Sequence, residues 1–230
     1  VADPKWLEIA ATYITENIVA LEGEVRIPEN GALTLTAKGM ESLTRQGGYQ
    51  TCNMFYRKDI FESVKGFDLN FPYYFEDSDL AWTIKALGHS IPYAAGAIIT
   101  HPVFPNNPWK LKDVAKRVEK LVYLEHKHPD EFKKNRTKYF GKAWLVFLVI
   151  GSLLLLSLLF DLPYLTLALG ISYFALISYQ VYRLYHGTVF QKKEILITIY
   201  LNSYLPFVAL YYFCLGKLRL MFSSQSEKAI

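Results

Sequence analysis

Acidic side chains are concentrated in one aromatic and apolar stretch, NFPYYFEDSDLAW, at residues 70–82. Glu76, Asp77 and Asp79 lie there among five aromatic residues. A carboxylate beside residues that favour burial is costly unless it caps a helix, forms an ion pair or takes part in a reaction. This stretch is therefore the first place to look for chemistry.

Two interpretations of these acids are open. In the first, Asp77 or Ser78 caps a helix predicted for Asp79–Leu87, and the acids stabilise its positive end. In the second, Asp77 is a general base that faces a cleft, and the same helix end holds it in place.

The acidic stretch lies within a segment that alternates helices and strands. Asp3 and Pro4 are typical of a helix start, as N-cap and first helical residue. The order of elements is that of an α/β domain, with too few strands for a complete doubly wound sheet. The other predicted elements are a strand at Asn17–Ile27, a turn at Pro28–Gly31, weak helix at 32–45, a strand at Thr51–Tyr56, a helix at Arg57–Gly66, and short strands at Ser90–Tyr93 and Ala97–Thr100.

A basic amphipathic helix is predicted for Trp109–His126. Its apolar residues follow the i, i+3, i+4 pattern, and its lysines lie mostly on the rest of its circumference. It either packs on its own domain or lies on a membrane with its lysines at the headgroups, and its place before the apolar stretches slightly favours the membrane. His126 and His128 at its end are expected to face solvent, so we propose no metal there.

Three apolar stretches follow, at Ala143–Phe160, Tyr164–Tyr182 and Ile195–Leu215. Each is long enough to cross a bilayer. The third contains Pro206, so it is either a full span or a re-entrant hairpin, and we favour the full span because positive charges after a last span are tolerated. The sequence thus predicts a multi-pass membrane protein.

The net charge of +4 is unevenly distributed. Residues 1–100 hold 8 Lys and Arg against 13 Asp and Glu, whereas residues 101–142 hold 11 against 5. Basic residues at 133–142 and 183–193 flank the first two spans on one side, which predicts that this side, with residues 1–142, is cytoplasmic. No basic run interleaved with aromatic residues of the nucleic-acid-binding type is present. Cys52 and Cys214 fall one in each half, which argues against an internal disulfide.

Several short motifs follow one another along the first part of the chain. They are TCNMFYR at 51–57, FESVKGFD at 61–68, EDSDLAW at 76–82, Gly88, and His101 with Pro102. In order and spacing they are similar to the acceptor-side half of a family 2 inverting glycosyltransferase with the GT-A fold, over residues 1–105. The basic helix and apolar stretches resemble those of membrane-bound members that build bacterial surface polysaccharides or glycolipids of the cell envelope.

The resemblance implies roles for the acidic residues. Asp77 occupies the position of the general base, which takes the proton of an acceptor hydroxyl as that oxygen attacks the anomeric carbon. Glu76 and Asp79 would orient the acceptor or the local turn.

Three further residues have roles implied by the same resemblance. His101 would ligate a divalent metal beside the donor diphosphate, or else is a strand-end histidine bonded to backbone. Trp82 either packs its helix or forms a wall of the acceptor site. Asn53 is expected on a strand near the cleft, as an acceptor-binding residue.

The sequence departs from the family pattern in two places. The Asp-x-Asp pair that would hold most of the Mg²⁺ or Mn²⁺ and the nucleotide-sugar donor is absent ahead of Asp3, so we expect the chain to be a fragment that is inactive alone. The Gln-x-x-Arg-Trp motif of processive synthases is also absent, which favours single or limited transfer to a lipid-linked or glycan acceptor.

These inferences divide the chain into three regions: the second half of a glycosyltransferase domain at 1–105, a basic interfacial helix region at 106–142, and a transmembrane helical region at 143–230. The expected function is inverting transfer from a nucleotide-sugar at the inner membrane. The alternative is a membrane-anchored binding or scaffold protein with a degenerate, non-catalytic domain. A small transporter is disfavoured because the apolar stretches contain few polar groups.

Overall fold

The computed structural model describes residues 1–28, 34–40, 44–72, 74–135 and 137–226. The chain forms two compact units, one of residues 1–106 with 124–135, the other of residues 107–123 with 136–230. Residues 124–135 thus belong with the first unit. Three sequence features lie partly outside the described residues: the predicted turn at 29–31, the predicted weak helix at 32, 33 and 41–43, and the acidic stretch at Tyr73.

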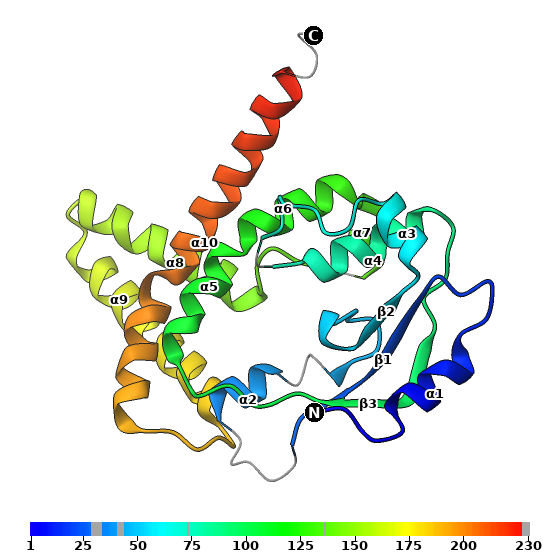
Figure 1. The fold of residues 1–230 in the computed structure, drawn as a ribbon. Coiled ribbons are helices and arrows are strands. Elements are labelled where there is room, and N and C mark those ends of the chain that lie inside the picture. Colours follow the sequence, from blue (N-terminus) through cyan, green and yellow to red (C-terminus); the bar gives the residue numbers. More distant parts are fainter. Residues whose placement is uncertain (29–33, 41–43, 73, 136, 227–230) are drawn as a thin grey trace. The chain divides into compact units, whose positions relative to one another are not determined.

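A small mixed sheet forms the centre of the first unit. Its order is β2-β1-β3, so that β1 (Ala20–Arg26) pairs antiparallel with β2 (Met54–Tyr56) and parallel with β3 (Tyr93–Thr100) (Figure 1). β3 is one continuous strand, where the sequence predicts two. Its pairing with β1 shifts register between Gly23 and Glu24. The α/β class is confirmed by this unit.

Helices cover both faces of the sheet because successive side chains of a strand point to opposite sides. On one face Leu21 packs with Ala10 of α1 (Trp6–Tyr13). On the other, Ala20 packs with Leu80 and Ile84 of α4 (Glu76–Ala86). α4 and its acidic first turn are therefore held directly against the central strand.

The start of α4 bears on the capping interpretation of the acidic stretch. The helix begins at Glu76, three residues earlier than predicted. Its N-cap is Phe75, whose φ of 69° is left-handed and whose side chain forms no capping hydrogen bond. Asp77 and Ser78 are therefore not N-caps, because both lie inside the first turn, whereas the acids do stand at the positive end of the helix, as that interpretation predicts.

Other predicted elements are present with altered bounds. α1 begins at Trp6 after an N-cap at Lys5, and the Asp3 side chain accepts a hydrogen bond from the Lys5 amide at 2.9 Å instead of capping the helix. Residues Thr51–Asn53 form a 3₁₀ turn, not a strand. The remaining helices of this unit are α2 (Leu35–Met40), α3 (Lys58–Ser63) and α7 (Pro129–Lys134).

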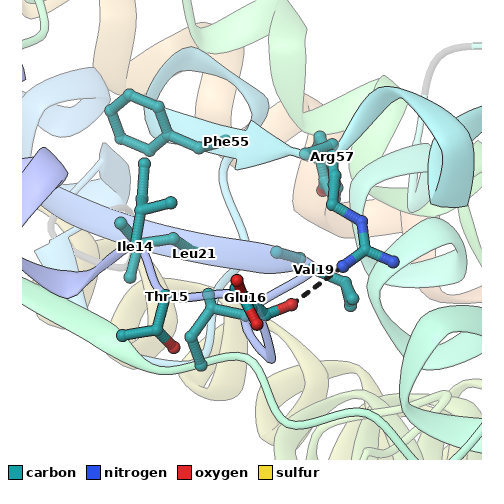
Figure 2. A pocket seen from close by; sticks show the side chains of 10 residues that line it. Ile14, Thr15, Glu16, Val19, Leu21, Phe55 and Arg57 are labelled. Atoms are coloured by element: carbon teal, nitrogen blue, oxygen red, sulfur yellow. Dashed lines mark hydrogen bonds between the residues drawn. The ribbon is translucent and has the colours of Figure 1, made fainter.

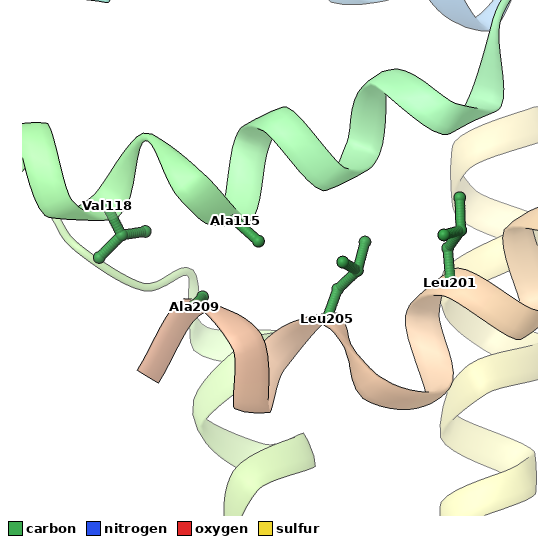
Figure 3. Close-up of a cluster of buried hydrophobic side chains, with 5 residues drawn as sticks. All are labelled: Ala115, Val118, Leu201, Leu205 and Ala209. Atoms are coloured by element: carbon green, nitrogen blue, oxygen red, sulfur yellow. The ribbon is translucent and has the colours of Figure 1, made fainter. Parts of the chain in front are cut away.

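The predicted helix at Trp109–His126 is divided into three pieces. They are η3 (Pro108–Lys110), α5 (Leu111–Lys116) and α6 (Val118–Lys127). Within the second unit, their apolar side is covered by the last helix of the chain: Ala115 and Val118 pack against Leu201, Leu205 and Ala209 (Figure 3). Part of the apolar side that the pattern predicts is therefore a contact surface for the last helix.

The three predicted apolar stretches are helices: α8 (Lys142–Leu159), α9 (Pro163–Tyr185) and α10 (Lys192–Ser226). Each is long and apolar enough to cross a membrane. α10 is one helix that contains Pro206, so it is not a hairpin of two helices. The chain thus has the features of a membrane protein.

Candidate functional site

Asp77 is a partly buried carboxylate without a cationic partner among the described residues. It lies in the first turn of α4, and its Oδ1 accepts a hydrogen bond from the Ser78 amide at 2.7 Å. Burial raises its pKa to about 6, and the neighbouring charge of Glu76 adds to the rise. At neutral pH such a carboxylate is mostly ionised and well suited to accept a proton.

Polar groups from the β1–β2 region lie close to this carboxylate. Burial raises the pKa values of Tyr56 and Cys52, and the charge of Asp77 raises both further. Among the described residues, the Tyr56 hydroxyl and Glu76 Oε2 are buried and lack a hydrogen-bond partner. Buried polar atoms in native proteins usually have a partner, so these two atoms make the surroundings of Asp77 a candidate ligand site.

Glu22 fixes the loop beside this cluster. This β1 residue is only 4% exposed, and its carboxylate accepts hydrogen bonds from the amides of Gly47 and Tyr49, both at 2.8 Å. The sequence indicates only a flexible Gly-Gly connection here, and a glutamate on a strand gives no signal of this role. Because its charge also raises the pKa of Tyr56, Glu22 belongs to the electrostatic surroundings of the site.

Asn53 is buried and its side-chain amide is used within the fold. Its Nδ2 donates to the carbonyls of Glu24 and Ala97, both at 2.8 Å, and its Oδ1 accepts from Trp6 Nε1 at 2.8 Å. The two donated hydrogen bonds bind carbonyls of β1 and β3 where the pairing of these strands shifts register. A Cβ on Gly23 would lie 2.4 Å from Asn53 Nδ2, so glycine is required there. Asn53 lies near the site, but its polar atoms serve the sheet.

Asp79 is buried in an ion-paired cluster. It is 1% exposed, and its carboxylate accepts hydrogen bonds from Lys127 Nζ at 2.9 Å and His128 Nε2 at 2.8 Å. Lys127 also pairs with Asp68 at 2.7 Å. The expectation that His128 faces solvent is wrong, since it is 8% exposed. Sequence reasoning missed Lys127 and His128 because they lie 48 and 49 residues from their partner.

Trp82 and His101 both make local packing contacts. Trp82 is 5% exposed and its ring lies edge-on to that of His128, with centroids 5.8 Å apart, as the packing interpretation predicts. His101 follows β3; its Nδ1 donates to the Pro102 carbonyl at 2.8 Å, and its ring packs edge-on to Phe104. Among the described residues, no three His, Cys, Asp or Glu side chains converge to hold a metal.

A cavity of about 540 Å³ lies beside β1 and β2 (Figure 2). Its wall is mostly apolar, with Ile14, Leu21 and Phe55 on one side. At its other end Arg57 donates to the Glu16 carbonyl at 3.0 Å. Tyr56 also lines this cavity, so one residue whose pKa the charge of Asp77 raises belongs both to the acidic site and to the wall of this cavity.

None of the protein families, curated proteins or solved structures compared with the chain matches it.

Proposed function

We propose that the chain belongs to a membrane-bound inverting glycosyltransferase and contributes its general base, Asp77. The observation that carries this proposal is a carboxylate with a pKa raised to about 6, without a cationic partner in the described chain and beside buried polar atoms that lack partners. The motif resemblance of residues 51–102 points to the same residue independently. The three apolar helices agree with attachment to a membrane.

In this proposal Asp77 takes the proton of an acceptor hydroxyl as that oxygen forms a bond to the anomeric carbon of a nucleotide-sugar. The bond from that carbon to the diphosphate breaks on the opposite face, so the configuration inverts. A base is most effective when its pKa lies near the working pH, and burial has moved Asp77 toward that range.

The neighbours of Asp77 have supporting roles in the same proposal. The Tyr56 hydroxyl and Glu76 carboxylate would hydrogen-bond the acceptor, since each has a buried oxygen without a partner in the described part of the chain. Asp79 would act as a positioning residue, because its bonds to Lys127 and His128 hold the first turn of α4 in place.

The family resemblance also implies Mg²⁺ or Mn²⁺. No three such ligands converge among the described residues, and the resemblance assigns most of the metal binding to the Asp-x-Asp pair that this sequence lacks. We therefore derive no step through a metal from these residues. The cytoplasmic side, the inner membrane, the nucleotide-sugar donor and the lipid-linked or glycan acceptor are parts of the proposal that rest on the sequence.

A non-catalytic, membrane-anchored protein is the second candidate. It is favoured by one observation: Asn53, Asp79 and Trp82 all lie in structural contacts with little exposure. The two candidates differ at Asp77, because a scaffold gains nothing from an unpaired, partly buried acid.

The test is sugar transfer by membranes from cells that express the complete gene containing residues 1–230. Membranes are incubated with a panel of radiolabelled nucleotide-sugars, and incorporation into lipid and polymer fractions is counted. Asp77→Asn should reduce transfer by about 10²-fold or more at an unchanged amount of protein. The matched control is Asp130→Asn, which removes an exposed carboxylate. Equal transfer by Asp77→Asn and the parent would reject Asp77 as the base, whereas no transfer by parental membranes with any donor of the panel would leave the non-catalytic candidate.

A further inference from the structure

Within the second unit, α10 touches the same end of the α8–α9 pair at two widely separated places. α8 and α9 form a hairpin that turns at residues 160–162. The start of α8 and the end of α9 therefore lie at one end of the hairpin, and the turn lies at the other. Both regions of α10 described below contact the end that is away from the turn.

The first contact is made early in α10. The Tyr185 hydroxyl, at the end of α9, hydrogen-bonds to Thr198 Oγ1 at 2.8 Å, and Thr198 is fully buried. The second contact is made 15 residues later. The ring of Phe213 lies 4.8 Å from that of Tyr139 and 5.6 Å from that of Phe140, just ahead of α8.

Between these contacts α10 also touches residues in the middle of the hairpin. A Cβ on Gly151, midway along α8, would lie 2.6 Å from the ring tip of Phe207. From midway along α9, the Tyr173 hydroxyl donates to the Ser203 carbonyl at 2.7 Å. Residues 198–213 of a helix extend about 22 Å. If α10 crossed beside the hairpin, that length would bring Phe213 level with about residue 170 of α9, beyond the middle of the hairpin, and not to Tyr139.

The segment 107–123 packs along the same length of α10. Trp109 contacts Tyr200 with ring centroids 6.5 Å apart, Ala115 and Val118 pack on Leu205 and Ala209, and Glu119 pairs with Arg219. Figure 3 shows the apolar part of this contact. The segment carries five cationic residues: Lys110, Lys112, Lys116, Arg117 and Lys120.

These cations oppose a transmembrane position for α10. Charged side chains in the hydrocarbon core are expensive, whereas at the headgroups of anionic lipids they are favourable. The apolar window of α10 is also 33% buried, against 17% in α8 and 11% in α9, so α10 is the least available of the three to lipid.

We propose that α8 and α9 alone cross the bilayer, and that α10 lies across the basic end of their hairpin in the headgroup region, together with residues 107–123. The partner of this surface is anionic lipid. The residues ahead of α8 and the end of α10 then lie on the same side of the membrane. This inference concerns topology and does not depend on the proposed catalytic function.

Cross-linking in native membranes tests the contact. The full chain is prepared with Cys52→Ser and Cys214→Ser, because both native cysteines are unpaired and exposed. A Tyr139→Cys, Phe213→Cys pair is treated with a short bis-maleimide and compared with a Leu159→Cys, Phe213→Cys pair. We expect the first pair to cross-link and the second to stay uncoupled. Cross-linking of the second pair in place of the first would show that α10 crosses.

Labelling with a membrane-impermeant maleimide tests the topology itself. In the same cysteine-free chain, single cysteines replace Leu69, Tyr164 and Met221, which are 93%, 89% and 62% exposed. We expect positions 69 and 221 to label from one side of sealed vesicles and position 164 from the other. The proposal is overturned if position 221 labels with position 164, if all three label from one side, or if position 221 labels only after detergent.

Discussion

His128 Nε2 donates a hydrogen bond of 2.8 Å to the carboxylate of Asp79, and so joins the first turn of α4 to the residue that follows α6. Asp77 lies two residues before Asp79. Residues two apart on a helix do not share a face. This is why neighbouring acids of one motif have different surroundings: Asp79 is fully buried and ion-paired, whereas Asp77 has no cationic partner among the described residues.

Removing the Asp79 carboxylate should destabilise the first unit strongly. Asp79→Ala leaves His128 and Lys127 without their buried acceptor, and breaking such a pair typically costs about 3–5 kcal/mol. The melting temperature of the purified protein in detergent should fall by several degrees. Asp68→Ala is the control, because its partly exposed pair with Lys127 should contribute about 1 kcal/mol or less. Equal effects of the two variants would contradict this account of the cluster.

Asn53→Ala should act on stability and not on acceptor binding. The change leaves the indole N–H of Trp6 and the carbonyls of Glu24 and Ala97 without their partner, and each unsatisfied buried group costs about 1–3 kcal/mol. Thermal unfolding measures the loss, and Asn70→Ala, at an exposed turn, is the control. If the variant keeps the parental melting temperature but raises the KM for acceptor, Asn53 is an acceptor ligand as the sequence suggests.

Asp77→Asn should stabilise the protein above about pH 6. Burial raises the pKa of Asp77 from 3.8 to about 6 in the folded state, so the folded protein binds this proton more tightly than the unfolded chain does. The stability that the proton contributes is present below about pH 4 and is lost as the pH rises through about 6. At neutral pH the variant should therefore gain up to about 3 kcal/mol.

The measurement is the difference in melting temperature between Asp77→Asn and its parent at pH about 4 and about 7.5. We expect a difference near zero at the lower pH and a positive one at the higher. A variant that is less stable than its parent at neutral pH would show that Asp77 has a stabilising partner.

Tyr56→Phe should weaken acceptor binding without lowering stability. The Tyr56 hydroxyl is buried and has no hydrogen-bond partner among the residues that the structure describes, so its removal should leave the melting temperature unchanged or raise it slightly. Under the proposed function the same change weakens the acceptor complex and raises its KM several-fold, with a smaller effect on kcat. An unchanged KM would remove Tyr56 from the acceptor site.

The sequence predicts helices and strands well where the residue pattern of one short segment determines them. The apolar runs became α8, α9 and α10, and the α/β order of residues 1–100 became a sheet with helices on both faces. The start of α4 could not be predicted, because a left-handed Phe75 is not a residue that normally precedes a helix. The break at Arg117 was also hidden inside a regular amphipathic pattern.

The candidate site was only partly predictable for a different reason. Asp77 stood out because an acid among aromatic residues is rare, and its placement follows from the first turn of one helix. Tyr56, Glu22 and His128 are residues of common types, and nothing in their local sequence marks them as part of a site. They come near the start of α4 only because residues of β1 and β2 and the residues at the end of α6 pack around that helix. Charge pairing across nearly 50 residues leaves no local pattern in one sequence.

The pH dependence of sugar transfer tests the role of Asp77 most directly. kcat/KM is measured from pH about 5 to about 8.5 in membranes from the complete gene, with protein integrity checked at each pH. A base whose pKa is raised to about 6 predicts a plateau above that pH and a tenfold loss per unit below it. Asp77→Asn should lose both the rate and this limb, while Asp130→Asn keeps them. A profile that is flat across pH 6 in the parent, or an acid limb that survives in Asp77→Asn, would contradict the assignment of Asp77 as the base.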